Sequence, residues 1–205
     1  MNEKTESLRW IPKDWLGPMA PAHVFPHADR PIEVDVGCGK GRFLLARARR
    51  HPEINFLGIE RLLGRLRKVD RRAIRAGLDN IRLLRAEAGY ATTYLLPPTA
   101  ISAYYIFFPD PWPKTRHHDH RLFNPDYVSA LARTLVPGGA VHVATDHEPY
   151  FSEIVMALGR DPRFSPIEPF EPSEEERTDF ELAYAENRPI FRCAFRRVFH
   201  FDAAD

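Results

Sequence analysis

Short apolar runs alternate with stretches of helical periodicity from residue 32 to residue 158, and this alternation constrains the fold more than any other feature. The first run, Ile32–Val36, is β-branched and is followed by glycine, which is typical of a buried strand. Further strands are predicted at residues 54–59, 81–84, 103–108 and 140–144, and helices at residues 42–50, 62–76, 126–135 and 150–158. Strands that alternate with helices imply right-handed crossovers and a mostly parallel sheet covered on both faces. The sequence therefore predicts an α/β fold.

Both ends of the chain depart from this alternation. Residues 1–31 are predicted to form an extended arm, ahead of a domain over residues 32–205, because the arm carries Pro12, Pro18, Pro21, Pro26 and Pro31. In residues 190–201, phenylalanine and cysteine alternate with arginine, which predicts an antiparallel edge strand with one solvated face. The acidic, proline-rich residues 162–176 are predicted to be a mobile surface loop.

The composition is that of an ordinary soluble domain. The chain has 205 residues, of which 44% are hydrophobic and 28% are charged. The longest apolar run, residues 103–109, is too short to span a membrane, and residues 1–10 lack the apolar core of a signal peptide. Cys38 and Cys193 lie far apart, so the sequence predicts neither a disulfide framework nor a metal cluster. These features favour a protein of the reducing cytoplasm.

The net charge is only +1, but its distribution is uneven. Residues 40–85 contain fourteen Lys and Arg against four acids, whereas residues 161–187 contain nine acids against two arginines. A molecule polarised in this way can bind a polyanion on one side while it stays nearly neutral overall. The alternative, that these residues form solvated helix faces, remains open at this point.

A glycine-rich loop follows the first predicted strand. In Asp35–Gly41, Gly37 and Gly39 allow the backbone to approach a ligand, and the next helix presents free N–H groups. The dinucleotide-binding pattern requires a third glycine at position 42, where this chain has Arg42. The loop therefore favours a smaller nucleoside ligand over NAD.

A carboxylate stands at or near the end of every predicted parallel strand. These residues are Asp35, Glu60, Glu87, Asp110 and Asp146. Ligands of open α/β sheets bind at the carboxyl edge, where an acid such as Glu60 can accept hydrogen bonds from both hydroxyls of a ribose. We expect the five acids to surround one ligand site.

The most informative segment is Phe107–Lys114, in which three prolines flank an acid and a tryptophan. Proline restricts the backbone as it leaves the sheet, and such rigidity suits a site that must fix one carboxylate, Asp110. A cluster of cations and histidines follows and could bind a phosphate backbone. Its members are Lys114, Arg116, His117, His118, His120 and Arg121. A metal site built from the histidines is not expected, because no acid or cysteine has suitable spacing.

These residues resemble the bacterial tRNA (guanine-N7-)-methyltransferases, which use S-adenosylmethionine as cofactor. The likeness covers roughly residues 33–196 and is most specific at Phe107–Lys114. It includes Asp35–Gly39, Gly58–Glu60, Asn80–Ala88, Ala144–Tyr150 and Thr178–Glu181.

The resemblance implies a Rossmann-like class I methyltransferase sheet and an S-adenosylmethionine pocket lined by Asp35, Gly37, Gly39, Glu60, Glu87 and Asp110. It also implies that the guanine meets Lys114, Asp146, Thr178, Asp179, Phe180 and Glu181. RNA contacts would come from Arg116, His117, His118 and Arg121. The family's usual target is the guanosine at position 46 of the tRNA variable loop. One departure is Glu87, which stands where family members have aspartate.

Asp110 is the residue expected to act in catalysis, either by placing charge near the purine or by holding the Watson–Crick edge of guanine. Competing hypotheses are another class I RNA or protein methyltransferase, a tRNA-binding protein with a degenerate methyltransferase fold, and an NAD-dependent oxidoreductase. The adenine-N6 and glutamine methyltransferases use an Asn/Asp-Pro-Pro-aromatic motif, which Asp110–Pro113 does not match. No membrane or metal is expected, and the sequence leaves the oligomeric state open.

Overall fold

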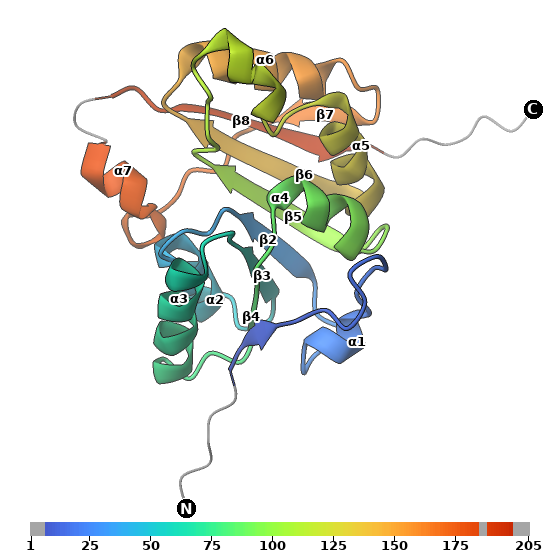
Figure 1. Ribbon diagram of the computed structural model, residues 1–205, viewed down its shortest axis with the longest axis vertical. Helices are drawn as coiled ribbons and strands as arrows, with labels where there is room; N and C mark the ends of the chain where they lie inside the picture. Colours follow the sequence, from blue (N-terminus) through green and yellow to red (C-terminus); the bar gives the residue numbers. More distant parts are fainter. Residues whose placement is uncertain (1–6, 185–187, 199–205) are drawn as a thin grey trace, which may run out of the picture.

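One mixed sheet of eight strands forms the centre of the molecule (Figure 1). The computed structural model describes residues 7–184 and 188–198, except for the side chains of Thr115 and His118. The strands lie in the order β1-β4-β3-β2-β5-β6-β8-β7. Their bounds are β1 Arg9–Trp10, β2 Ile32–Val36, β3 Asn55–Ile59, β4 Ile81–Leu84, β5 Ile101–Phe107, β6 Leu135–Thr145, β7 Phe164–Ile167 and β8 Phe191–Arg197. The first six strands in this order, from β1 to β6, are all parallel to their neighbours. Strand β8 runs antiparallel to both β6 and β7.

Helices cover both faces of this sheet. The α-helices are α1 Pro21–Val24, α2 Arg42–Arg50, α3 Leu63–Arg75, α4 Ala88–Tyr90, α5 Pro125–Thr134, α6 Glu148–Gly159 and α7 Asp179–Tyr184. A π-helical turn, η1 Ala91–Leu95, follows α4, and 3₁₀ turns form η2 Thr115–His120 and η3 Glu174–Glu176. No helix in the described part of the chain is long and apolar enough to cross a membrane.

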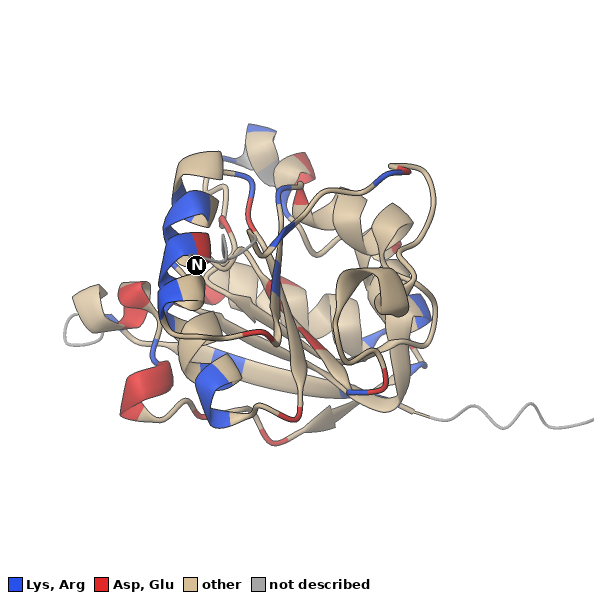
Figure 2. Ribbon diagram, turned by 90° about the horizontal axis from the view of Figure 1, so that it is seen from below, with Lys and Arg blue, Asp and Glu red and all other residues tan. Residues whose placement is uncertain are grey.

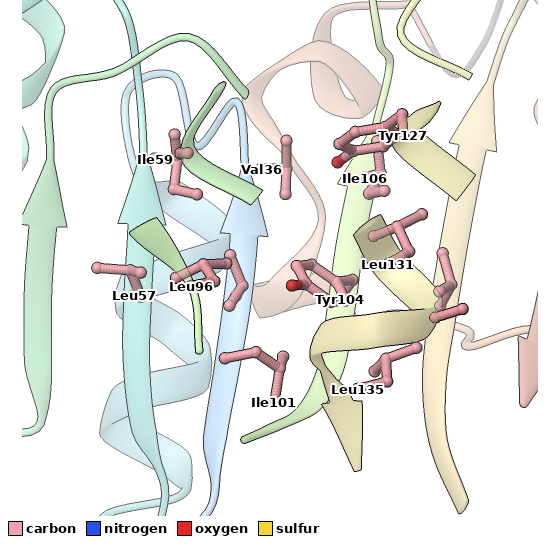
Figure 3. Close-up of a cluster of buried hydrophobic side chains, with 14 of the residues drawn as sticks. Val36, Leu57, Ile59, Leu96, Ile101, Tyr104, Ile106, Tyr127, Leu131 and Leu135 are labelled. Carbon is pink, nitrogen blue, oxygen red and sulfur yellow. The ribbon is translucent and has the colours of Figure 1, made fainter. Parts of the chain in front are cut away.

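The largest hydrophobic core lies between the sheet and the helices α1, α5 and α6 (Figure 3). Tyr104 and Ile106 of β5 meet Tyr127 and Leu131 of α5 there. A second core packs α2 and α3 against the opposite face of β3 and β4. Successive side chains of a strand point to opposite faces of the sheet. Because helices cover both faces, every position of a central strand can be apolar, which explains the continuous apolar runs in the sequence.

Local signals set the starts of the later helices. Asn124 caps α5 by accepting a hydrogen bond from the Tyr127 N–H, and Pro125 occupies the first helical position. At α6, the His147 Nδ1 accepts a hydrogen bond from the Tyr150 N–H at 3.1 Å. These caps explain why both helices begin one or two residues before the apolar periodicity does.

The predicted α/β fold with a mostly parallel sheet is confirmed, and strands β2 and β4 and helix α2 have the predicted bounds. The edge position predicted for the last strand is wrong, because β8 is paired on both sides and β7 forms that edge. The segment predicted as a mobile loop, residues 162–176, supplies β7 and η3. The predicted arm is extended only in part, because Pro21–Val24 form a helical turn. Its extended residues Arg9–Trp10 pair with β4. Its side chains enter the main core at Met19, Val24 and Phe25.

Gly41 lies where the start of α2 packs against α3, the two helices that cover the second core. It caps α2 with a φ of 76°, and a Cβ at this position would lie 2.7 Å from both methyl groups of Val69 in α3. Neither the backbone conformation nor the space therefore suits a side chain.

We predict that Gly41→Ala lowers the free energy of unfolding by about 1–3 kcal/mol, because it adds a clash to a left-handed backbone. The matched control is Gly64→Ala in α3, where a Cβ would meet open space. That control should raise stability by up to about 1 kcal/mol through helix propensity. Urea denaturation measures both changes, and equal effects at the two positions would contradict this packing argument.

Candidate cofactor and substrate site

A cavity of about 600 Å³ lies at the carboxyl edge of the parallel strands. The loops after four neighbouring strands each contribute to its lining: Gly37 after β2, Glu60 after β3, Glu87 after β4 and Asp110 after β5. The order of the strands reverses direction between β2 and β5, and a crevice forms where connections leave a sheet in opposite directions. The structure thus brings together four of the predicted cofactor-binding residues, and Arg121, predicted to contact RNA, also lines this cavity.

Glu60 is the most enclosed carboxylate of this lining, at 6% exposure. Its Oε1 accepts a hydrogen bond from the Leu62 N–H at 2.7 Å, and its Oε2 lies 3.6 Å from Nη1 of Arg65. A carboxylate held from both sides in this way is well placed to accept hydrogen bonds from a ligand in the cavity.

Glu87 has a second task besides lining the cavity. Its two carboxylate oxygens accept hydrogen bonds from the N–H groups of Gly89 and Tyr90, at 2.9 and 2.7 Å. The side chain therefore caps α4 in the manner usually seen for aspartate or asparagine. The additional methylene of glutamate lets the carboxylate turn back onto the helix start.

Asp35 lies outside the cavity lining, on the side of the sheet that faces α2. Its side chain is 5% exposed, and its Oδ2 has no hydrogen-bond partner among the described residues. Burial, reinforced by the negative charge of Glu60, raises the pKa of Asp35 to about 8. Gly39 is likewise absent from the lining, whereas the N–H groups of Gly37 and Cys38 both donate to the Ile59 carbonyl and fix the loop.

The proline-rich turn carries backbone strain on both sides of Asp110. Phe108 and Trp112 have φ values of 55° and 42°, in the left-handed region that bulky residues rarely adopt. Both line the cavity, and the Asp110 side chain between them is exposed. Strain of this kind persists only where the surroundings impose it, and it is concentrated at functional sites.

Arg121 is one of the groups that impose this conformation. It is 6% exposed; its Nε donates to the Pro111 carbonyl at 2.8 Å, and its Nη1 lies 2.5 Å from the Glu153 carboxylate. The structure therefore uses Arg121 inside the protein to hold the turn, and not on the surface where an RNA contact was expected. Lys114 and Arg116 are exposed, and the ring of His117 lies 5.8 Å from that of Trp112, between centroids, in a tilted arrangement. The side chain of His118 lies outside the described part of the structure.

The segment after η3 forms a wall beside the cavity mouth. The ring of Phe180 in α7 lies 4.4 Å from that of Phe108, between centroids. Thr178 and Glu181 cap α7 reciprocally: the Thr178 N–H donates to Glu181, and the Glu181 N–H donates to the Thr178 hydroxyl. Glu181 is also paired with Arg192, and it is buried, whereas Asp179 is exposed. Phe180 does not line the cavity itself, but it contacts Phe108, which does.

Asp146 lies at the end of β6 and outside the cavity lining. Its Oδ2 is 2.6 Å from Nη1 of Arg188, whose guanidinium also lies 5.3 Å from the ring centroid of Tyr184. The predicted set of acids at the strand ends is thus divided: three line the cavity, while Asp35 and Asp146 flank it.

A family model described as "Putative methyltransferase" matches residues 29–188, which include every residue that lines the cavity. The chain belongs to this methyltransferase family. The predicted family resemblance is confirmed by its curated relatives. A protein of Nitrosococcus oceani named tRNA (guanine-N(7)-)-methyltransferase is 38% identical over 80% of this chain and 70% of its own length. Proteins of the same name from Nocardia farcinica and Rubrobacter xylanophilus are 36% and 42% identical over 78% and 66% of this chain. The matched region spans only 60% of the length of each of these two relatives.

Solved structures confirm the Rossmann-like methyltransferase fold. An rRNA methylase from Streptococcus thermophilus matches with a TM-score of 0.57 and 17% identity, over 87% of this chain and 92% of that chain. The 16S rRNA methyltransferase KamB matches with a TM-score of 0.62 and 16% identity, over 82% and 88%. At such identities the likeness concerns the fold alone.

Helix α2 is attached to η3 and to Arg177 by arginines that the sequence analysis did not select. The buried guanidinium of Arg47 lies 3.1 Å from the Glu33 carboxylate of β2 and 3.3 Å from that of Glu176 in η3. Arg42, in the place of the third glycine, donates from its Nε to the Arg177 carbonyl at 3.0 Å. The available signal was the position of Arg47, four residues after Phe43 and therefore on the apolar stripe of α2.

No group of three His, Cys, Asp or Glu side chains is placed to bind a metal ion in the part of the chain that the structure describes. The cavity has other features that suit a nucleoside cofactor. Its volume falls in the range of small-molecule sites, about 300–1,000 Å³, and Glu60 and Gly37 stand on adjacent strands of its wall.

The raised pKa of Asp35 predicts a specific pH dependence of stability. An acid whose pKa is higher in the folded state favours folding while it is protonated, so its contribution is complete below the unfolded pKa of about 4 and is lost as the pH rises towards about 8. Within this window, the free energy of unfolding should fall by up to about 1.4 kcal/mol per pH unit because of Asp35.

The Asp35→Asn variant should lose this decrease, as measured by urea denaturation between about pH 4 and pH 8. The variant is compared with the wild type at each pH, since other groups also titrate. Burial lowers the pKa of His142 to about 4, for example, which gives the opposite slope. Parallel stability curves for the two proteins would refute the assignment.

Proposed function

We propose that this chain transfers the methyl group of S-adenosylmethionine to N7 of a guanosine in tRNA, at position 46 of the variable loop. The observation that carries the proposal is the 38% identity to the Nitrosococcus oceani tRNA (guanine-N(7)-)-methyltransferase over 80% of this chain. The family match includes the whole cavity and the strained turn at Asp110. A tRNA substrate would place this activity in the cytoplasm.

The cavity would hold the cofactor at the switch point of the sheet. Glu60 would accept hydrogen bonds from the ribose hydroxyls, and the loop at Gly37 and Gly39 would let the backbone approach the ligand closely. Glu87 would stand on the next strand of the same wall, with its carboxylate fixed by α4. Asp35, whose pKa is raised to about 8 by burial, would be mostly protonated at neutral pH and would add little negative charge to the site.

When bound, S-adenosylmethionine supplies an activated methyl group on a positively charged sulfur. Guanine N7 is a hydrogen-bond acceptor with a free lone pair in the ring plane, so the protein needs no base to prepare it. What the side chains must provide is alignment and negative charge near the purine, which becomes cationic. Asp110 would supply that charge, since it lines the cavity on a turn that Arg121 and the prolines hold rigid.

The substrate guanine would enter between the turn and the wall formed by α7. Phe180 offers a ring at this mouth, with Thr178, Asp179 and Glu181 shaping the segment behind it. Lys114, Arg116, His117 and His118 would meet the neighbouring RNA, and Asp146 would help to hold the guanine from the end of β6. We assign no RNA contact to Arg121, because its guanidinium is buried.

Incubation of the purified chain with unmodified tRNA and methyl-labelled S-adenosylmethionine tests the function directly. We expect the label in 7-methylguanosine after digestion to nucleosides, and no label in a tRNA that carries adenosine at position 46. Label in another nucleoside would identify a different RNA methyltransferase. Binding of tRNA without any transfer would support a non-catalytic binding protein.

The role of Asp110 is tested by Asp110→Asn, which keeps the shape of the side chain and removes its charge. Turnover should fall by about 10²-fold or more, because the charge acts in the transition state, while the melting temperature stays unchanged. Asp119→Asn is the matched control, since Asp119 is another exposed acid of the cavity lining. Turnover of Asp110→Asn as high as that of this control would exclude a catalytic role for the Asp110 charge.

A further inference from the structure

Helix α3 carries a strongly basic outer surface that the proposed reaction does not explain. Six of its thirteen residues are Lys or Arg, and all six are exposed: Arg65, Arg67, Lys68, Arg71, Arg72 and Arg75. Figure 2 shows Lys and Arg positions, in blue, along the length of this helix, which lies at the outside of the molecule. At a rise of 1.5 Å per residue, the helix presents these cations, from Arg65 to Arg75, over a length of about 15 Å.

The acid of this helix does not balance its cations at the surface. Asp70 is 8% exposed and faces the N-terminal segment, where it accepts hydrogen bonds from the Ser7 hydroxyl and the Leu8 N–H, both at 2.8 Å. Arg9 lies 3.5 Å from the same carboxylate, so it adds a further cation beside α3. Arg65 lies 3.6 Å from Glu60, but the other five cations of the outer face have no acidic partner among the described residues, so their positive charge remains available to a ligand.

The spacing of the cations works against the stability of the helix. Arg67 and Arg71, Lys68 and Arg72, and Arg71 and Arg75 are like-charged pairs four residues apart, which destabilise a helix. A merely solvated face would be more stable with acids at some of these positions. The arrangement thus suits a face that gains its opposite charge from a ligand.

This face continues to the mouth of the cavity. Arg61, just before α3, and Arg65, in its first turn, line the cavity beside Glu60. Further along the helix, Nη1 of Arg72 donates to the Lys40 carbonyl of the glycine loop at 2.7 Å. An elongated polyanion whose reactive group entered the cavity would therefore lie along α3.

We propose that the outer face of α3 binds the phosphate backbone of the RNA whose base is methylated. The inference rests on the proposed function, and it adds a second contact surface to the one expected at Lys114 and Arg116. Arginine predominates on the face, and its guanidinium can make paired hydrogen bonds to a phosphate. An RNA is favoured over an anionic membrane because the face ends at the cavity, where an RNA methyltransferase must receive its substrate.

The test compares two double variants that remove the same charge. Lys68→Gln/Arg75→Gln alters the α3 face at residues that make no ion pair or side-chain hydrogen bond in the described structure. Arg160→Gln/Arg196→Gln is the control, at exposed positions after α6 and on β8. The affinity for unmodified tRNA is measured by fluorescence anisotropy over a range of salt concentrations.

For the α3 variant, the slope of log affinity against log salt should shrink by about 0.7–0.9 for each cation removed, because fewer counterions are displaced. The control should keep the wild-type slope. The KM for tRNA should rise in the α3 variant while the affinity for S-adenosylmethionine, measured by calorimetry, stays unchanged. The melting temperature should be unchanged or higher, since like charges have been removed.

A wild-type slope for the α3 variant, together with a reduced slope for Lys114→Gln/Arg116→Gln, would overturn the proposal and place the RNA at the loop alone. Binding of the wild type to phosphatidylserine vesicles that tRNA does not displace would assign the face to a membrane. Failure of the proposed function is recognised separately. If the labelled product is not 7-methylguanosine but the α3 slope still shrinks, the surface remains an RNA-binding face with another target base.

Discussion

The parallel arrangement of β2, β3, β4, β5 and β6 is the constraint on which the rest of this structure depends. Parallel strands bring all of their following loops to one edge of the sheet, and the connections from β2 and β5 leave that edge in opposite directions. The crevice between them is therefore a consequence of strand order. Glu60 and Asp110 line one cavity because they follow strands on the two sides of β2.

A buried cation of α2 connects β2 with η3. Arg47 stands between Glu33 of β2 and Glu176 of η3, and the rings of Tyr105 and Phe170 lie 5.4 and 5.3 Å from its guanidinium carbon. Because an unpaired buried charge is strongly unfavourable, the three ionic groups must stay together. The segment that carries Phe180 is consequently anchored to the same helix that follows the glycine loop.

Much of the fold could be predicted because the signals are local. The apolar run at Ile32–Val36 with the glycine after it, and the periodicity of α2 with Pro52 soon after it, can be recognised within a few residues. The cavity acids could also be predicted, since Glu60 follows β3 directly and Glu87 and Asp110 each stand three residues after the end of a strand. The prediction of strand pairing was wrong. The alternating pattern of β8, with one solvated face, is typical of an edge strand, but β8 pairs with β6 along one edge and with β7 along the other.

The sequence by itself determined the alternation of strands and helices, the acids at the strand ends and the rigid proline-rich turn, because each depends on neighbours in the chain. Only the tertiary structure decided that Arg121 is buried under that turn, that Glu87 caps α4, and that Asp35 lies beneath the cavity and not in it. Arg121 carries the same charge as exposed Arg116 five residues earlier, so composition cannot separate them. The difference comes from Glu153, a partner 32 residues away that only folding brings within 2.5 Å.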